Sequence, residues 1–254
     1  MIFIKSFLIA LSTYSIIPVP QFDWNEKNMK NAICFFPIVG ILCGGVLFGW
    51  YAFCRTFDVS NFLFAVIAVC IPIIFTGGIH MDGYMDTVDA LSSHQPRERK
   101  LEILKDSHCG AFSVIYCIIY LLLDIAFFYE LFNKGNVTVV CPVFVLSRAM
   151  SVLYAVNMPN ARKSGMLNAY TENTERKRVN ASMAGTAIIS AAVILFISPV
   201  SGAISVCFGL VFSFFYRRMV IKQFGGVTGD TAGFFLQVFE LSCIAGTLIG
   251  ALIK

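Results

Sequence analysis

The chain has 254 residues, of which 57% are hydrophobic and only 13% are charged, and its mean hydropathy is +0.77. This composition excludes an ordinary soluble domain and indicates an integral membrane protein. The net charge of +4 is no sign of a nucleic-acid partner, because Lys and Arg in a membrane protein first reflect its topology.

The N-terminal 17 residues are apolar, but Lys5 interrupts them and Pro18-Val-Pro20 follows without a small-x-small cleavage site. This pattern predicts a retained helix that lies at the membrane interface or is half inserted, rather than a signal peptide. The nine cysteines include no CxxC pair and fall mostly in apolar segments, so we expect them to be packing residues.

Several windows are long enough to cross about 30 Å of hydrocarbon. A further apolar region, 182–216, is broken by Pro and Gly at 198–202 and predicts two short spans joined by a tight turn. We therefore expect an all-α polytopic membrane protein with about seven transmembrane helices, forming a single domain over residues 1–254. The other predicted spans are 32–54, 61–79, 110–132, 137–156 and 233–253.

Most Lys and Arg residues fall on one side of this seven-span arrangement, in the polar segments 81–109, 157–181 and 217–232. The positive-inside rule then places these segments in the cytoplasm and the C-terminus outside. We expect the protein in the cytoplasmic (inner) membrane, with its polar chemistry on the cytoplasmic side.

Three carboxylates and a histidine follow the second predicted span. In a helix, Asp82, Asp86 and Asp89 share one face, where their charges repel unless a cation joins them. Oxygen-only ligands at a membrane edge suit Mg²⁺. The alternative is a solvated acidic helix start, which accounts for Asp82 but less well for the other two.

His80 is open to three interpretations: a general base, a partner to a metal-bound carboxylate, or a polar residue at the interface. The turn Gly225-Gly-Val-Thr-Gly-Asp230 is typical of loops that present backbone amides to phosphate, although it lacks the lysine of a Walker loop. Asp230 is a further candidate metal ligand.

Basic segments carry the remaining candidates. Residues 96–105 predict a short amphipathic basic helix that either faces lipid or contacts substrate, and the segment 162–165 is a candidate phosphate clamp. Charges inside spans are costly unless paired, so we also expect Arg148 to pair with Glu240.

Taken in chain order, these sequence motifs resemble those of the cobalamin synthase family, the adenosylcobinamide-GDP ribazoletransferases. Ala90 and the pair Lys163-Ser164 are small departures that touch no candidate ligand. The matching segments are 36–40, 77–89, 105–110, 147–148, 162–165 and 225–230, with Glu240 beyond them.

The resemblance implies the reaction. A hydroxyl of α-ribazole, or of its 5′-phosphate, attacks the phosphorus nearer cobinamide in adenosylcobinamide-GDP, and GMP leaves in a Mg²⁺-dependent step. We expect His80 or Asp89 as the base, and a lipid bilayer but no nucleic acid as partner. The expected metal ligands are Asp82, Asp86, Asp89 and Asp230, and the expected phosphate contacts are Lys105, Arg148, Arg162, Gly225, Gly226 and Thr228.

Two classes of protein compete with this interpretation. A CDP-alcohol phosphatidyltransferase or an intramembrane prenyltransferase would need acidic repeats that are incomplete here. An ion or corrinoid transporter would explain intramembrane charges but fits poorly with polar residues on one side only. The sequence leaves open the lower-ligand base, the number of metal ions and whether the protein is a homo-oligomer.

Overall fold

A computed structural model describes residues 2–20, 32–106, 108–162, 165–171 and 174–253. Within these residues the chain is helical, and its one β feature is an isolated bridge between Asn160 and Val227. The all-α prediction is therefore confirmed. The elements are α1 (Ile2–Tyr14), η1 (Ala32–Phe35), α3 (Phe36–Thr56), α4 (Asn61–Phe75), α5 (Ile79–Ser92), α6 (Arg97–Ile103), α7 (Ala111–Lys134), η2 (Val137–Val139), α8 (Val143–Asn157), α9 (Met166–Thr171), α10 (Arg176–Ile197), α11 (Pro199–Phe224) and α12 (Gly229–Ile253).

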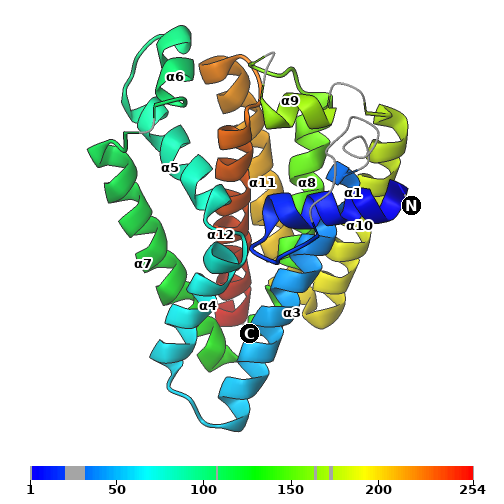
Figure 1. Ribbon diagram of the computed structural model, residues 1–254. Coiled ribbons are helices and arrows are strands. Elements are labelled where there is room, and N and C mark those ends of the chain that lie inside the picture. Colours follow the sequence, from blue (N-terminus) through cyan, green and yellow to red (C-terminus); the bar gives the residue numbers. More distant parts are fainter. Residues whose placement is uncertain (1, 21–31, 107, 163–164, 172–173, 254) are drawn as a thin grey trace.

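Six helical segments of the described chain are long and apolar enough to cross a membrane, and the bent pair α4 and α5 adds a seventh if it counts as one span. This agrees with the expected number of about seven. The N-terminal helix α1 is short and apolar, and in Figure 1 it lies across the longer helices.

The two predicted spans with a turn at 198–202 are confirmed, but the spans are longer than expected and the loop after them is shorter. The region 182–216 forms parts of two full-length helices, α10 with 22 residues and α11 with 26, which turn at Ser198. The expected loop 217–232 is mostly helix, because α11 continues through its basic end to Phe224. Arg and Lys are good helix formers, and their long side chains reach the interface from a helix that extends beyond the hydrocarbon.

The chain bends sharply between α4 and α5. Gly77 and Gly78 take left-handed backbone angles, with φ of +64° and +79°, which end α4 at little steric cost. The two helices meet at 92°. As a result, α5 leaves the direction of the span and lies along α12, as Figure 1 illustrates.

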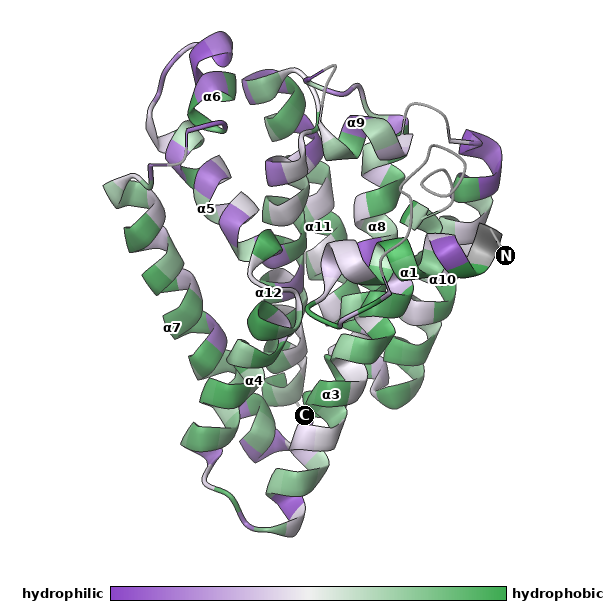
Figure 2. Ribbon diagram, in the orientation of Figure 1, coloured by the Kyte–Doolittle hydropathy of each residue, from purple (hydrophilic) through white to green (hydrophobic). Residues whose placement is uncertain are grey.

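Helix α12 forms the centre of the bundle, and most of its length is buried between α5, α7, α8 and α11. The outer faces of α7, α10 and α11 expose large apolar side chains such as Ile119, Ile189 and Phe215. Figure 2 shows these helices as predominantly hydrophobic. An apolar surface of this kind fits contact with lipid.

Close approach of α3 to the segment before α8 depends on Gly44. A Cβ at Gly44 would lie 2.6 Å from the carbonyl oxygen of Cys141, whereas a Cβ at Gly45 would meet nothing within 4 Å. We predict that Gly44→Ala lowers the free energy of unfolding by about 1–3 kcal/mol through overpacking. Gly45→Ala, the matched control, should be neutral or stabilising by up to about 1 kcal/mol. Thermal unfolding in detergent, followed by circular dichroism, measures both, and equal midpoints would contradict the prediction.

Candidate active site

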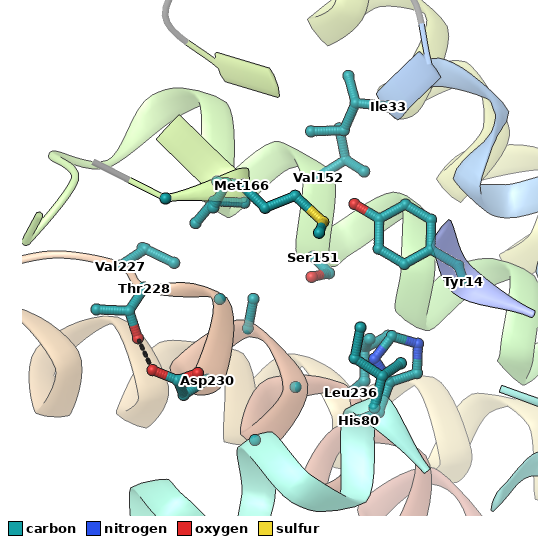
Figure 3. Close-up of a pocket in the computed structure, with 18 of the residues that line it drawn as sticks. Tyr14, Ile33, His80, Ser151, Val152, Met166, Val227, Thr228, Asp230 and Leu236 are labelled. Atoms are coloured by element: carbon teal, nitrogen blue, oxygen red, sulfur yellow. Dashed lines mark hydrogen bonds between the residues drawn. The ribbon is translucent and has the colours of Figure 1, made fainter. Parts of the chain in front are cut away.

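A cavity of about 280 Å³ opens between α1, α5, α8, α9 and α12 (Figure 3). Its volume is close to the lower end of the range for small-molecule sites, about 300–1,000 Å³. The predicted residues that line it are His80, Asp82, Arg162, Thr228 and Asp230.

Helices α5 and α12 bring acids from distant parts of the chain together. A Cβ at Gly83 would lie 2.8 Å from the carbonyl oxygen of Asp230, and one at Gly233 would lie 3.0 Å from that of His80. Small residues at the crossing therefore let the two backbones approach. This contact places Asp82 and Asp230 on the wall of one cavity, as the sequence predicted.

Asp86 lies at the electrostatic centre of the acidic residues. The negative charges of Asp82, Asp230 and Asp89 repel that of Asp86. The positive charge of Arg162 attracts it. Asp89 lies one turn further along α5, where its carboxylate occupies the space that a Cβ at Gly110 would need. Asp82, Asp86 and Asp89 thus lie on one helix, with the carboxylate of Asp89 directed toward the start of α7.

Within the described residues, no three His, Cys, Asp or Glu side chains converge closely enough to hold a metal ion by themselves. The donor set nevertheless fits Mg²⁺, which typically takes one or two carboxylates and completes its shell with waters and substrate phosphates. Repulsion among four carboxylates also favours a cation between them.

Arg162 connects the acids to the basic helix α6. Its Nη1 lies 3.4 Å from Oδ2 of Asp230, and its Nη2 donates a 2.9 Å hydrogen bond to the carbonyl oxygen of Leu101. The Nε atom is buried without a hydrogen-bond partner in the described structure. The side chain as a whole is 22% exposed and borders the cavity, so its positive charge can act on an anion there. Lys163 and Ser164 of the same motif lie outside the described residues.

The glycine-rich turn is used mainly for packing, contrary to the expectation for Gly225 and Gly226. The Gly225 N–H donates to Ile221 and the Val227 N–H to Pro159, at 3.0 and 2.8 Å. Side chains at the two glycines would overlap the guanidinium of Arg97 and the carbonyl of Pro159. Neither glycine lines the cavity.

The part of this turn that borders the cavity is instead the start of α12. Thr228 and Thr231 cap the helix reciprocally, with N···Oγ1 distances of 2.8 and 3.1 Å. Thr228, Gly229 and Asp230 all border the cavity. The partial positive charge of a helix N-terminus favours an anion there.

His80 lies at the other end of the cavity beside Tyr14 (Figure 3), and its ring centroid is 5.6 Å from that of Phe36. It is 6% exposed, and its Nε2 has no hydrogen-bond partner among the described residues. Burial, and secondarily the neighbouring Tyr170, raise the pKa of Tyr14 above its ordinary value, so its phenol remains a hydrogen-bond donor at neutral pH.

The expected pairing of Arg148 with Glu240 is confirmed. Nη1 of Arg148 lies 2.9 Å from Oε1 of Glu240, which also accepts a 2.6 Å hydrogen bond from the hydroxyl of Ser147. Arg148 is thus committed to the bundle interior and does not line the cavity. Lys105, at the end of α6, is exposed and also lies away from it. The structure therefore does not bring these two expected phosphate contacts to the site.

The comparison with protein families bears directly on this site. The family described as cobalamin-5-phosphate synthase matches residues 6–248 of the chain. The chain belongs to the cobalamin-5-phosphate synthase family. This confirms the resemblance that the sequence blocks indicated.

Individual relatives of the family match along nearly their whole length, and each of the following is named adenosylcobinamide-GDP ribazoletransferase. The protein from Lachnoclostridium phytofermentans is 39% identical, over 94% of this chain and 91% of its own. Those from Clostridium perfringens strain 13 and Clostridium botulinum strain Alaska E43 are 30% and 32% identical, and more than nine tenths of each chain is covered. No solved structure matches the chain significantly.

The sequence analysis did not identify several residues that line the cavity, among them Tyr14, Ser151 and Asn160. Asn160 had a usable signal, because it lies two residues before Arg162 and pairs across the bridge with Val227. Tyr14 had none, since it reaches the cavity only through the way α1 folds back over the bundle.

Proposed function

We propose that this protein is an adenosylcobinamide-GDP ribazoletransferase. The oxygen of an α-ribazole hydroxyl forms a bond to the phosphorus nearer cobinamide, and the bond from that phosphorus to the GMP oxygen breaks. The hydroxyl proton passes to a base, and GMP leaves. The observation that carries the proposal is the meeting of Asp82, Asp230 and Arg162 on one cavity wall, together with the name shared by the relatives.

We propose Mg²⁺ as the cofactor, held by Asp82, Asp86 and Asp230, with Asp89 one turn away. When bound, the ion neutralises diphosphate charge and orients the leaving group. The close approach of α5 to α12 supports this ligand set, because it joins acids that are far apart in sequence.

The chain's own groups hold the diphosphate. Arg162, which borders the cavity and is 22% exposed, offers its positive charge, and the start of α12 offers the partial positive charge of a helix N-terminus. For the base, the sequence left His80 and Asp89. We favour a carboxylate of the acidic face, because His80 lies at the opposite, aromatic end of the cavity.

We further propose that the cavity faces the cytoplasm in the cytoplasmic membrane. The basic helix α6 lies beside the site, since Arg97 covers Gly225 and Leu101 binds Arg162. The positive-inside rule favours this end of the bundle as the cytoplasmic one. Both substrates are soluble in water, which agrees with that orientation.

The test is direct. Purified protein incubated with Mg²⁺, adenosylcobinamide-GDP and α-ribazole should release GMP and form the joined cobamide in equal amounts. Omitting α-ribazole, or chelating the metal with EDTA, should stop GMP release. GMP release that does not require α-ribazole would indicate a hydrolase, and the absence of GMP from folded protein would contradict the proposed reaction.

A further inference from the structure

The cavity has two chemically different ends. Thr228 and Asp230 lie at one end, with Arg162 3.4 Å from Asp230 and with Asp82 close enough for its charge to act on Asp230. Aromatic and aliphatic side chains around His80 form the other end. Figure 3 shows this separation, with Thr228 and Asp230 on one side and Tyr14, His80 and Leu236 on the other. One ligand that fills the cavity would therefore have a charged or polar part and an apolar part.

The apolar end is built from rings. The ring centroids of Tyr14 and Phe36 are 4.2 Å apart, and that of His80 is 6.2 Å from Tyr14 and 5.6 Å from Phe36. Tyr14 and His80 are nearly parallel, with 26° between their planes. Side chains of this kind bind flat, apolar ring systems by stacking and edge contacts.

His80 is the polar group within this aromatic end. Its side chain is more than nine tenths buried, yet its Nε2 has no hydrogen-bond partner in the described residues. A buried polar atom without a partner is unfavourable, and a ligand that supplies one removes this cost. The imidazole therefore selects for a ring with a hydrogen-bonding atom.

We propose that the aromatic end is the subsite for the benzimidazole base of α-ribazole, and that His80 and Tyr14 determine its recognition. This assignment rests on the proposed function. Glycosylated benzimidazole is flat and apolar and keeps one ring nitrogen as acceptor, to which the N–H of a neutral His80 can donate. The ribose then extends toward Asp82 and Asp230, where the hydroxyl meets the diphosphate.

The same reasoning favours benzimidazole over guanine at this end. Guanine carries a carbonyl, a ring N–H and an exocyclic amine, and Ile33, Val152 and Leu236 offer side chains that cannot bond to them. Burial of such groups without partners is costly. A corrinoid is far too large for a cavity of about 280 Å³. Of the parts of the two substrates, the ribazole base fits best.

The experiment measures binding separately from turnover. α-Ribazole is titrated calorimetrically into the full-length protein without the second substrate. Tyr14→Leu and His80→Phe should each raise its Kd about tenfold, as expected for one lost stacking or hydrogen-bonding contact. In the transfer reaction, the KM for α-ribazole should rise by a similar factor in both variants.

Two further variants keep the result interpretable. Phe7→Leu makes a similar change on the same helix, but Phe7 packs on Phe35 away from the cavity, so its Kd should equal that of wild type. Tyr14→Phe keeps the ring and should bind more tightly than Tyr14→Leu.

Three outcomes would overturn the subsite: unchanged Kd in Tyr14→Leu and His80→Phe, an equal loss in Phe7→Leu, or a collapse of kcat in His80→Phe with normal binding. The last would make His80 a reacting group. If wild type binds α-ribazole but releases no GMP, the proposed reaction fails while the subsite stands.

Discussion

Asp86→Asn is expected to abolish transfer while leaving the protein folded. If Asp86 holds the proposed Mg²⁺, its loss would remove part of the several kcal/mol of transition-state stabilisation that such an ion supplies, and kcat should fall by about 10³-fold or more. GMP release under saturating Mg²⁺ and both substrates measures this effect.

Stability should respond in the opposite direction. Asp82, Asp89 and Asp230 all oppose the charge of Asp86, and the neutral amide removes this repulsion. We therefore expect the unfolding midpoint of Asp86→Asn without metal to equal or exceed that of wild type, and the stabilisation by added Mg²⁺ to shrink. Because bound metal stabilises only the folded state, the second effect reports metal binding independently of turnover.

Asp58→Asn is the matched control. Asp58 is exposed in the loop between α3 and α4, and its φ of 51° suits Asn as well as Asp. It should leave activity, midpoint and Mg²⁺ response unchanged. Full activity in Asp86→Asn would remove Asp86 from the site, and a lowered midpoint without metal would make its role structural.

Much of this architecture was predictable because the bilayer limits the choices. Hydrophobic windows gave the spans, and the helical spacing of Asp82, Asp86 and Asp89 gave one acidic face. The pairing of Arg148 with Glu240 followed from the cost of isolated charges in a membrane. Each of these inferences depends either on the spacing of residues close together in the sequence or on the large free-energy cost of an unpaired charge in a membrane.

Long-range geometry was not predictable in the same way. The bend at Gly77 and Gly78 directs α5 along α12. The spacing of hydrophobic residues in the sequence does not indicate the angle between two consecutive helices. Gly225 and Gly226 have the sequence of a phosphate loop, but Arg97 and Pro159 occupy the space beside them. A glycine that permits close packing and one that permits ligand binding are alike in sequence, and only the neighbours distinguish them.

The buried pair Arg148 and Glu240 should be essential to stability. Their side chains are only 1% and 6% exposed. We predict that Arg148→Met destabilises the protein by about 3–5 kcal/mol, because Glu240 then remains buried with Ser147 as its hydrogen-bond donor. The double variant Arg148→Met with Glu240→Gln should recover much of this loss, since no buried charge is left alone. Denaturation in mixed detergent measures both.

The pair Arg99 and Glu102 on α6 provides the control that isolates burial as the cause. Its N···O distance of 2.6 Å is shorter than the 2.9 Å of the buried pair, yet both of its side chains are 63% exposed. Water screens such a pair, so Arg99→Met should cost no more than about 1 kcal/mol. If distance rather than burial governed the energy, Arg99→Met would be the more damaging change. A double variant at 148 and 240 that is as unstable as the sum of its single variants would equally contradict the account, because the two residues would then contribute independently.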